Sequence, residues 1–203
     1  MDFDILTSGL KNGWDAFKNN IVAYVLGLLI AVIGSILIVT IAPLVYGLSY
    51  MAVKGARGEK VEITDIFYGF KSVSAFIRSW MYYIVYVVVI IIIAVITYLL
   101  TMVSPFLSII GTLLSVIWAL VTFYSMYIYV MTPSENAVYA YKEGFNVLKE
   151  NLIMTILAYI VVYLLAVIGA ILLGIGLLVT IPIAFVFTVS VLKALKPGID
   201  AAN

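Results

Sequence analysis

Three long stretches of the chain contain no charged residue: 19–53, 79–134 and 151–192. Each is longer than the roughly 20 apolar residues that cross the hydrocarbon core of a bilayer as a helix. The alternating segments of about ten residues that form outer-membrane barrels are absent from them. The pattern therefore predicts an all-α, polytopic membrane protein.

Turn residues divide these stretches into hairpins. In the middle stretch we expect two helices separated at Ser104-Pro105, and in the last one two helices separated at Gly174-Ile175-Gly176. The apolar part of the first stretch, 21–53, would form a helix of about 50 Å, which is too long for one span and short for two. We predict six transmembrane helices arranged as three hairpins, with a short or partly re-entrant first hairpin.

A phrase in the first hairpin recurs in the last. AVIGSIL (31–37) matches AVIGAIL (166–172), and both copies are followed by a proline, Pro43 and Pro182. A glycine-aromatic pair precedes both copies, Gly13-Trp14 and Gly144-Phe145. The alternative is chance similarity among Ile, Val, Ala and Gly.

We interpret the matches as an internal repeat in which a surface helix is followed by a membrane hairpin. Residues 1–203 form a single membrane domain, with repeat unit 1 at about 3–58 and repeat unit 2 at about 134–198. The middle hairpin unit, about 64–131, is a candidate third copy because Gly69-Phe70 lies in front of its hairpin.

One amphipathic stretch precedes the first hairpin, and two more lie between the hairpins. Apolar residues recur there every three or four positions, as on one face of a helix: Phe3, Leu6, Leu10, Trp14 and Phe17; Ile66, Phe70, Val73 and Ile77; and Ala137, Tyr141, Phe145 and Leu148. Such helices commonly lie in the headgroup plane as anchors. Docking of a partner, or lipid sensing, is the alternative role.

Aromatic residues concentrate where the middle hairpin begins and ends, and this favours an aromatic belt at the membrane interface over a polar-aromatic cavity. Together with the amphipathic helices, they give the candidate interface or lipid contacts: Trp14, Phe70, Trp80, Tyr82, Tyr83, Tyr127 and Phe145.

Small residues at four-residue spacing let helix backbones approach closely in lipid, either between the repeats or between protomers. With the two prolines they form the set of candidate helix-packing or pore residues: Gly27, Ala31, Ser35, Pro43, Ala166, Ala170, Gly174 and Pro182.

The distribution of charge predicts the topology. With six spans, all 11 Lys and Arg residues fall on one side of the membrane. The positive-inside rule then places the N- and C-termini in the cytoplasm, in a multi-pass protein of the cytoplasmic membrane. The N-terminus opens with acidic residues and lacks the basic region of a signal peptide, so we expect the first apolar stretch to be retained.

Composition excludes several classes of function. Hydrophobic residues make up 66% of the chain and charged residues 10%, against about 25% charged in soluble domains. Cysteine and histidine are absent, which removes the thiolate nucleophile, the thiolate metal site and the usual general base. We therefore expect no enzyme, no metal and no cofactor. The net charge of +1 gives no field that would attract nucleic acid.

Three phrases, EGFNVLKENL (143–152), LLGIGLLVTIPI (172–183) and KGARGEKVEITDIFYGF (54–70), carry a resemblance. The chain resembles a poorly characterised group of prokaryotic six-span integral membrane proteins that includes the membrane domain of some glycerophosphodiester phosphodiesterases. The resemblance implies a six-helix fold and a prokaryotic cytoplasmic membrane. It implies no catalytic residue, since the phosphodiesterase chemistry belongs to a separate soluble domain.

The expected function is that of a non-enzymatic scaffold or accessory subunit. Its partners would be membrane lipids and either further copies of itself, as a homo-oligomer, or other subunits of a heteromeric membrane complex. The alternative is a transporter or pore for a small apolar or amphipathic solute or lipid, at the repeat interface around Pro43 and Pro182. Ion-coupled transport is disfavoured because the predicted spans hold no ionisable group, and a lipid-modifying enzyme is the third hypothesis.

Overall fold

The computed structural model describes residues 3–132, 136–172 and 174–199, and within these ranges the chain forms helices and no strand. Five helices are long and apolar enough to cross a membrane. A sixth span results if α1 and α2, which are bent by 91° relative to each other, count as one. The prediction of an all-α protein with several membrane-length helices is confirmed, and the predicted number of six is reached if α1 and α2 form one span.

The elements follow one another along the chain with short connections. They are α1 (Asp4–Asn19), α2 (Ile21–Gly34), α3 (Ile38–Ala56), the 3₁₀ helix η1 (Ile63–Phe70), α4 (Val73–Val103), the 3₁₀ turn η2 (Pro105–Leu107), α5 (Ser108–Met131), α6 (Ala137–Glu150), α7 (Leu152–Ile171) and α8 (Leu177–Leu195). The breaks near Ser104-Pro105 and at Gly174–Gly176 fall where the sequence predicted them. At 14 residues, or about 21 Å, α2 is shorter than the bilayer core.

Three helices meet at the centre of the fold. α3, α5 and α8 contact one another, and each carries fully buried side chains of large volume, among them Tyr46, Tyr129 and Phe187. The rings of Tyr46 and Tyr129 pack edge to face with centroids 6.2 Å apart. The centre is thus closely packed with aromatic and aliphatic groups.

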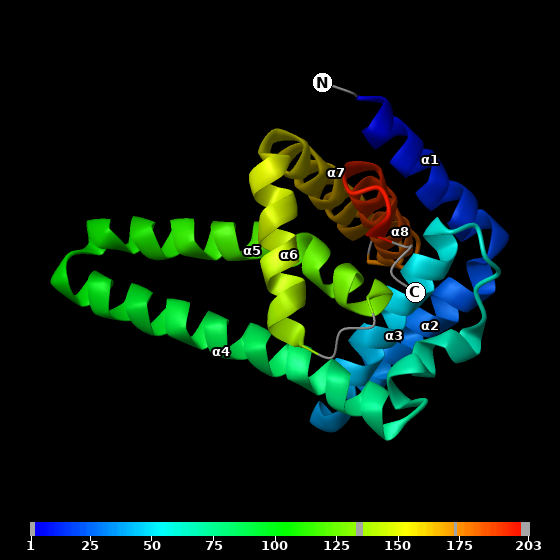
Figure 1. The fold of residues 1–203 in the computed structure, drawn as a ribbon, viewed down its shortest axis with the longest axis horizontal. Coiled ribbons are helices and arrows are strands. Elements are labelled where there is room, and N and C mark those ends of the chain that lie inside the picture. The colour runs from blue at the N-terminus through cyan, green and yellow to red at the C-terminus, as the bar shows by residue number, and fades with distance from the viewer. Residues whose placement is uncertain (1–2, 133–135, 173, 200–203) are drawn as a thin grey trace.

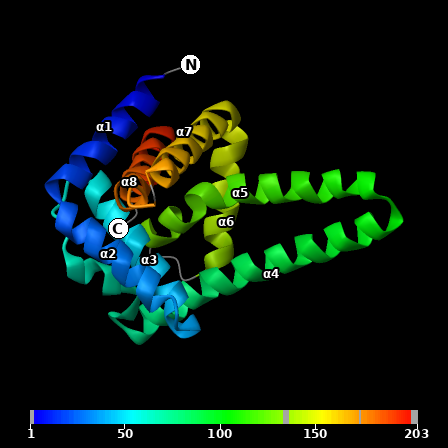
Figure 2. The ribbon, with the colours of Figure 1, turned by 180° about the vertical axis from the view of Figure 1, so that it is seen from behind.

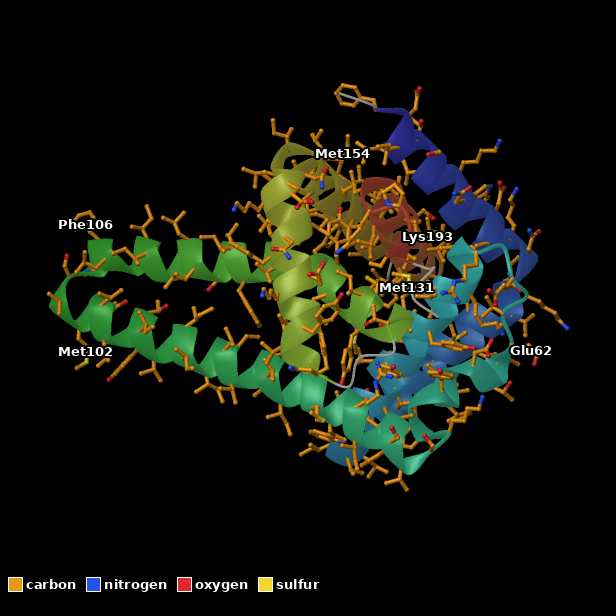
Figure 3. The ribbon with its side chains drawn as sticks, in the orientation of Figure 1. Glu62, Met102, Phe106, Met131, Met154 and Lys193 are labelled. Atoms are coloured by element: carbon orange, nitrogen blue, oxygen red, sulfur yellow. The ribbon has the colours of Figure 1, made fainter. Side chains whose placement is uncertain are left out.

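The remaining long helices lie outside this centre. α2 packs on α3 and α8, α4 on α5 and α3, and α7 on α8 and α5. α4 and α5 together extend as an arm beyond the rest of the molecule (Figures 1 and 2). Met102 and Phe106 mark its free end, opposite to Glu62 (Figure 3). The exposed surface of the arm is apolar, as a lipid-facing surface requires.

One predicted amphipathic helix is wrong. The stripe Ile66, Phe70, Val73 and Ile77 does not lie on one helix, because η1 ends at Phe70 and α4 begins at Val73. The Ser72 hydroxyl accepts a hydrogen bond from the Ala75 N–H and caps the start of α4. The chain therefore changes direction in the middle of the stripe.

Candidate membrane-interface site

All three glycine-aromatic pairs place the glycine against a backbone carbonyl of a central helix. A Cβ on Gly13 would lie 2.7 Å from the Ile183 carbonyl oxygen of α8, and one on Gly144 would lie 2.5 Å from the Val121 oxygen of α5. A Cβ on Gly69 would clash with the Pro43 carbonyl of α3. Glycine is required at each contact because any side chain would separate the two backbones.

The aromatic residue after each of these glycines is turned outwards. Trp14, Phe70 and Phe145 are 48%, 39% and 49% exposed. The predicted lipid contacts at these three positions are therefore available to solvent or lipid. A buried glycine followed by an exposed ring is common to the three elements.

The apolar stripes of α1 and α6 mainly face protein. Leu6 and Phe17 of α1 are buried, as are Tyr141 and Leu148 of α6. α1 covers α8 and α6 covers α5. We expected these stripes to face lipid, but the close approach at the glycines brings most of each stripe onto a central helix instead.

α1 and α6 share more than the glycine-aromatic pair. KNGWDAFKNN (11–20) aligns without gaps with KEGFNVLKEN (142–151), and this match escaped the sequence interpretation. Asn20 and Asn151 occupy the C-cap with nearly the same backbone angles, φ −137° and ψ 34° against φ −132° and ψ 41°. Each side-chain amide donates to the carbonyl four residues earlier, on Ala16 or Val147. Aligning the segments around Gly13 and Gly144 without gaps would have revealed this match from the sequence alone.

Trp80 contacts the helix that contains Pro43. A proline has no N–H, so in α3 the carbonyl four residues before Pro43, that of Val39, loses its intrahelical donor. The Trp80 indole Nε1–H donates to this Val39 oxygen at 3.2 Å. Trp80 therefore joins α4 to α3 at the point where the proline leaves an acceptor unpaired.

The tyrosines of the predicted belt lie at different depths. Tyr82 and Tyr127 are buried, and Tyr83 is half-buried. The Tyr82 hydroxyl and the Ser125 hydroxyl are 2.6 Å apart, and the Tyr141 hydroxyl donates to the Tyr82 carbonyl at 2.8 Å. The rings of Tyr82 and Tyr141 stack at 4.6 Å. These groups join α4, α5 and α6 inside the protein.

Arg78 belongs to the same region. Its guanidinium donates to the carbonyls of Tyr129 and Thr132, both at 2.9 Å, and lies 4.8 Å from the centroid of the Tyr129 ring. Both carbonyls belong to the C-terminal end of α5, where a cation is favoured by the helix dipole. Arg78 thus fixes the start of α4 to the end of α5.

Small residues of the first hairpin pack inside the fold. Gly27 and Ala31 are buried, and a Cβ on Gly27 would lie 2.8 Å from the Cε of Met51 in α3. Ser35 donates to the Ala31 carbonyl at 2.6 Å and is half-buried. Here the row of small residues joins α2 to α3.

The corresponding row in the last hairpin is exposed. Ala166, Ala170 and Gly174 all lie at the surface, and in their place Gly169 is buried against Leu177 of α8. Pro182 is buried. The structure therefore does not bring the eight candidate packing or pore residues together around one cavity.

An ion pair connects α6 to the end of α8. The Lys196 ammonium donates to the Glu143 carboxylate. The ammonium favours the charged carboxylate and lowers the pKa of Glu143 below its ordinary value, although burial acts in the opposite direction. This pair joins the part of α6 that contains Gly144 and Phe145 to the C-terminal end of α8.

An apolar cavity lies within the arm. A cavity of about 560 Å³ between α4 and α5 is lined by Tyr86, Ile90, Thr97, Ser115 and Trp118, among others. Its volume falls in the range of small-molecule sites. Within the described residues no group of three or more acidic side chains is placed to hold a metal ion.

Comparison of the chain with protein-family models, with curated proteins and with solved structures gave no match.

Proposed function

We propose that this protein is a non-enzymatic membrane scaffold or accessory subunit built from three related units. Each unit consists of an interface element and two helices: α1 with α2 and α3, η1 with α4 and α5, and α6 with α7 and α8. In each unit the glycine of the interface element contacts the second helix of another unit: Gly13 contacts α8, Gly69 contacts α3 and Gly144 contacts α5. The three contacts therefore follow one rule around the molecule, and this supports the arrangement. The gap-free match between α1 and α6 supports it independently.

The observation that carries the scaffold function is the filled centre. The rings of Tyr46 and Tyr129 pack against each other between α3 and α5, and those of Tyr127 and Phe185 pack against each other between α5 and α8. A central pathway would have to displace these rings, and rearranging a closely packed interior is costly. Exposed apolar residues cover the arm and the outer helices, and this surface suits contact with lipid or with another membrane protein.

We place the protein in the cytoplasmic membrane of a prokaryote, with both termini and the basic interface elements on the cytoplasmic side. The support is the segregation of all Lys and Arg residues outside the apolar stretches, together with the family resemblance of the sequence phrases. Labelling of a single cysteine introduced at Lys11 tests this topology. In intact cells the thiol should resist a membrane-impermeant reagent and react only after permeabilisation.

The second candidate function is lateral passage of a lipid or apolar solute. The apolar cavity between α4 and α5 favours it, because this cavity lies within the exposed arm and not at the filled centre. Pro43 and Pro182 are buried away from that cavity's lining, so passage there would not use the two prolines.

Reconstitution separates the two functions. We expect vesicles containing the purified protein to move fluorescent phospholipid between leaflets no faster than protein-free vesicles. We also expect the gently extracted protein to retain a second polypeptide, or further copies of itself, in native mass spectrometry. Lipid movement that stops when Ala94→Phe fills the cavity would contradict the scaffold function. Val95→Phe, on the exposed surface of the same helix, is the matched control.

A further inference from the structure

We infer that α1 and α6 each carry a binding site for an anionic phospholipid headgroup. The two sites have the same composition, an aromatic ring between two lysines: Lys11, Trp14 and Lys18 in α1, and Lys142, Phe145 and Lys149 in α6. The inference rests on the proposed function, since it assigns the lipid class that the scaffold's interface elements would contact.

Helix geometry places each set on one face. At 100° per residue, positions i, i+3 and i+7 lie within about 60° of one another, so both lysines flank the aromatic ring. The glycine at i+2 points about 200° from the first lysine, towards the opposite face. Because Gly13 and Gly144 pack against α8 and α5, each Lys-aromatic-Lys face points away from the protein.

The side chains have the exposure that this geometry requires. All four lysines are exposed, and the Lys18 ammonium lies 5.7 Å from the centroid of the Trp14 ring. Long cationic side chains that lie beside an aromatic ring and stay exposed are typical of a membrane surface, where the ammonium can reach the headgroup level.

Nearby acidic groups leave these lysines available. Asp15 lies 3.0 Å from Lys18 in an ion pair that is largely exposed, and such pairs contribute little. In α6 the adjacent Glu143 is already paired with Lys196, and Glu150 lies exposed beside Lys149. Among the described residues, Lys11, Lys142 and Lys149 form no ion pair.

An anionic lipid can interact with both the lysines and the aromatic ring of each face. Phosphate accepts hydrogen bonds from the ammonium groups, while the aromatic ring prefers the headgroup level, where its apolar body can enter the acyl region. An acidic protein surface would satisfy the lysines and leave Trp14 and Phe145 in a polar environment. The same spacing on two helices of a membrane-spanning chain therefore favours a lipid surface over an acidic partner.

Lipid titration of the purified protein tests the inference. Native mass spectrometry in mild detergent would compare the binding of phosphatidylglycerol and phosphatidylcholine of identical acyl chains. We expect the wild type to prefer phosphatidylglycerol, and each of Lys142→Gln and Lys149→Gln to weaken its binding at the α6 site roughly fivefold while the α1 site keeps its affinity, as expected from about 1 kcal/mol per lysine near an anionic surface. Lys142→Arg and Lys149→Arg should retain the preference, because they keep the charge.

Lys60→Gln is the matched control, since Lys60 has an 83% exposed side chain and lies outside both faces. Equal binding of the two lipids would overturn the inference, as would a loss in Lys60→Gln as large as that in Lys149→Gln. Preference for an acidic peptide over phosphatidylglycerol would also overturn it and would indicate a protein partner. Lipid movement in the reconstituted vesicles, with the phosphatidylglycerol preference intact, would overturn the scaffold function alone.

Discussion

The hydrogen bond between Trp80 and the carbonyl in front of Pro43 predicts a specific energetic coupling. Trp80→Phe keeps an aromatic ring but removes the indole N–H, and it leaves the Val39 carbonyl without a donor. The Nε1···O distance of 3.2 Å is at the long end of the normal range. A neutral hydrogen bond contributes about 0.5–1.5 kcal/mol, so we expect a loss of about 1 kcal/mol in the free energy of unfolding.

Trp80→Phe should lower the free energy of unfolding much less when it is combined with Pro43→Ala. The introduced alanine has an N–H that can donate to the Val39 carbonyl within the helix, so the indole is no longer the donor on which this carbonyl depends. We expect the two substitutions to show an interaction free energy of about 0.5–1 kcal/mol. A double-mutant cycle isolates this quantity from the change in ring packing.

Pro182→Ala supplies the control. Pro182 is the sixth residue of α8, as Pro43 is of α3, but the Trp80 hydrogen bond reaches only Val39. Unfolding would be measured by far-ultraviolet circular dichroism during titration of mild-detergent micelles with a denaturing detergent. The reasoning is refuted if Trp80→Phe costs the same beside Pro43→Ala as it does alone, or if the coupling to Pro182→Ala is equally large.

Three further predictions concern the interface elements. Gly144→Ala should destabilise the protein more than Gly27→Ala, because the first methyl meets a rigid carbonyl and the second meets the flexible end of a methionine; thermal unfolding in detergent compares them. Asn20→Ala should cost more than Asn151→Ala in the same assay, since Asn20 also accepts a hydrogen bond from the Val61 N–H at 2.9 Å; equal losses would contradict this. Because its folded-state pKa is lowered, Glu143 contributes stability that is present above the ordinary pKa of glutamate and is lost as the pH falls through the lowered value. The dependence of stability on pH in this acidic range should therefore be weaker in Glu143→Gln.

Charge and turn residues made the helices and most of their ends predictable. The breaks near Ser104-Pro105 and at Gly174–Gly176 follow from local chemistry, because a proline that follows a serine in extended conformation and a glycine in the left-handed conformation both end a helix. Gly174 indeed has φ 77°. The burial of Tyr82 and Tyr127 was not predictable in this way. A tyrosine at a helix end suits a membrane interface or a protein interior equally well, and partners such as Ser125 and Tyr141 come from other helices.

Gly13 and Gly144 have matching environments, whereas the two copies of the apolar phrase, AVIGSIL and AVIGAIL, do not. The number of residues between the glycine and the phrase explains the difference. Gly13 and Gly144 each precede the next helix by eight residues, so α2 and α7 begin in corresponding positions. Ala31 is then the eleventh residue of α2 and Ala166 the fifteenth of α7, a difference of four residues, or about 6 Å along the axis. Ala31 is buried under neighbouring helices, whereas Ala166 lies one turn further out and is exposed. The burial of a residue in α2 or α7 therefore depends on the number of residues that separate it from Gly13 or Gly144. Identity of the apolar phrase does not establish equal burial, and the α1–α6 match is the stronger evidence for repetition.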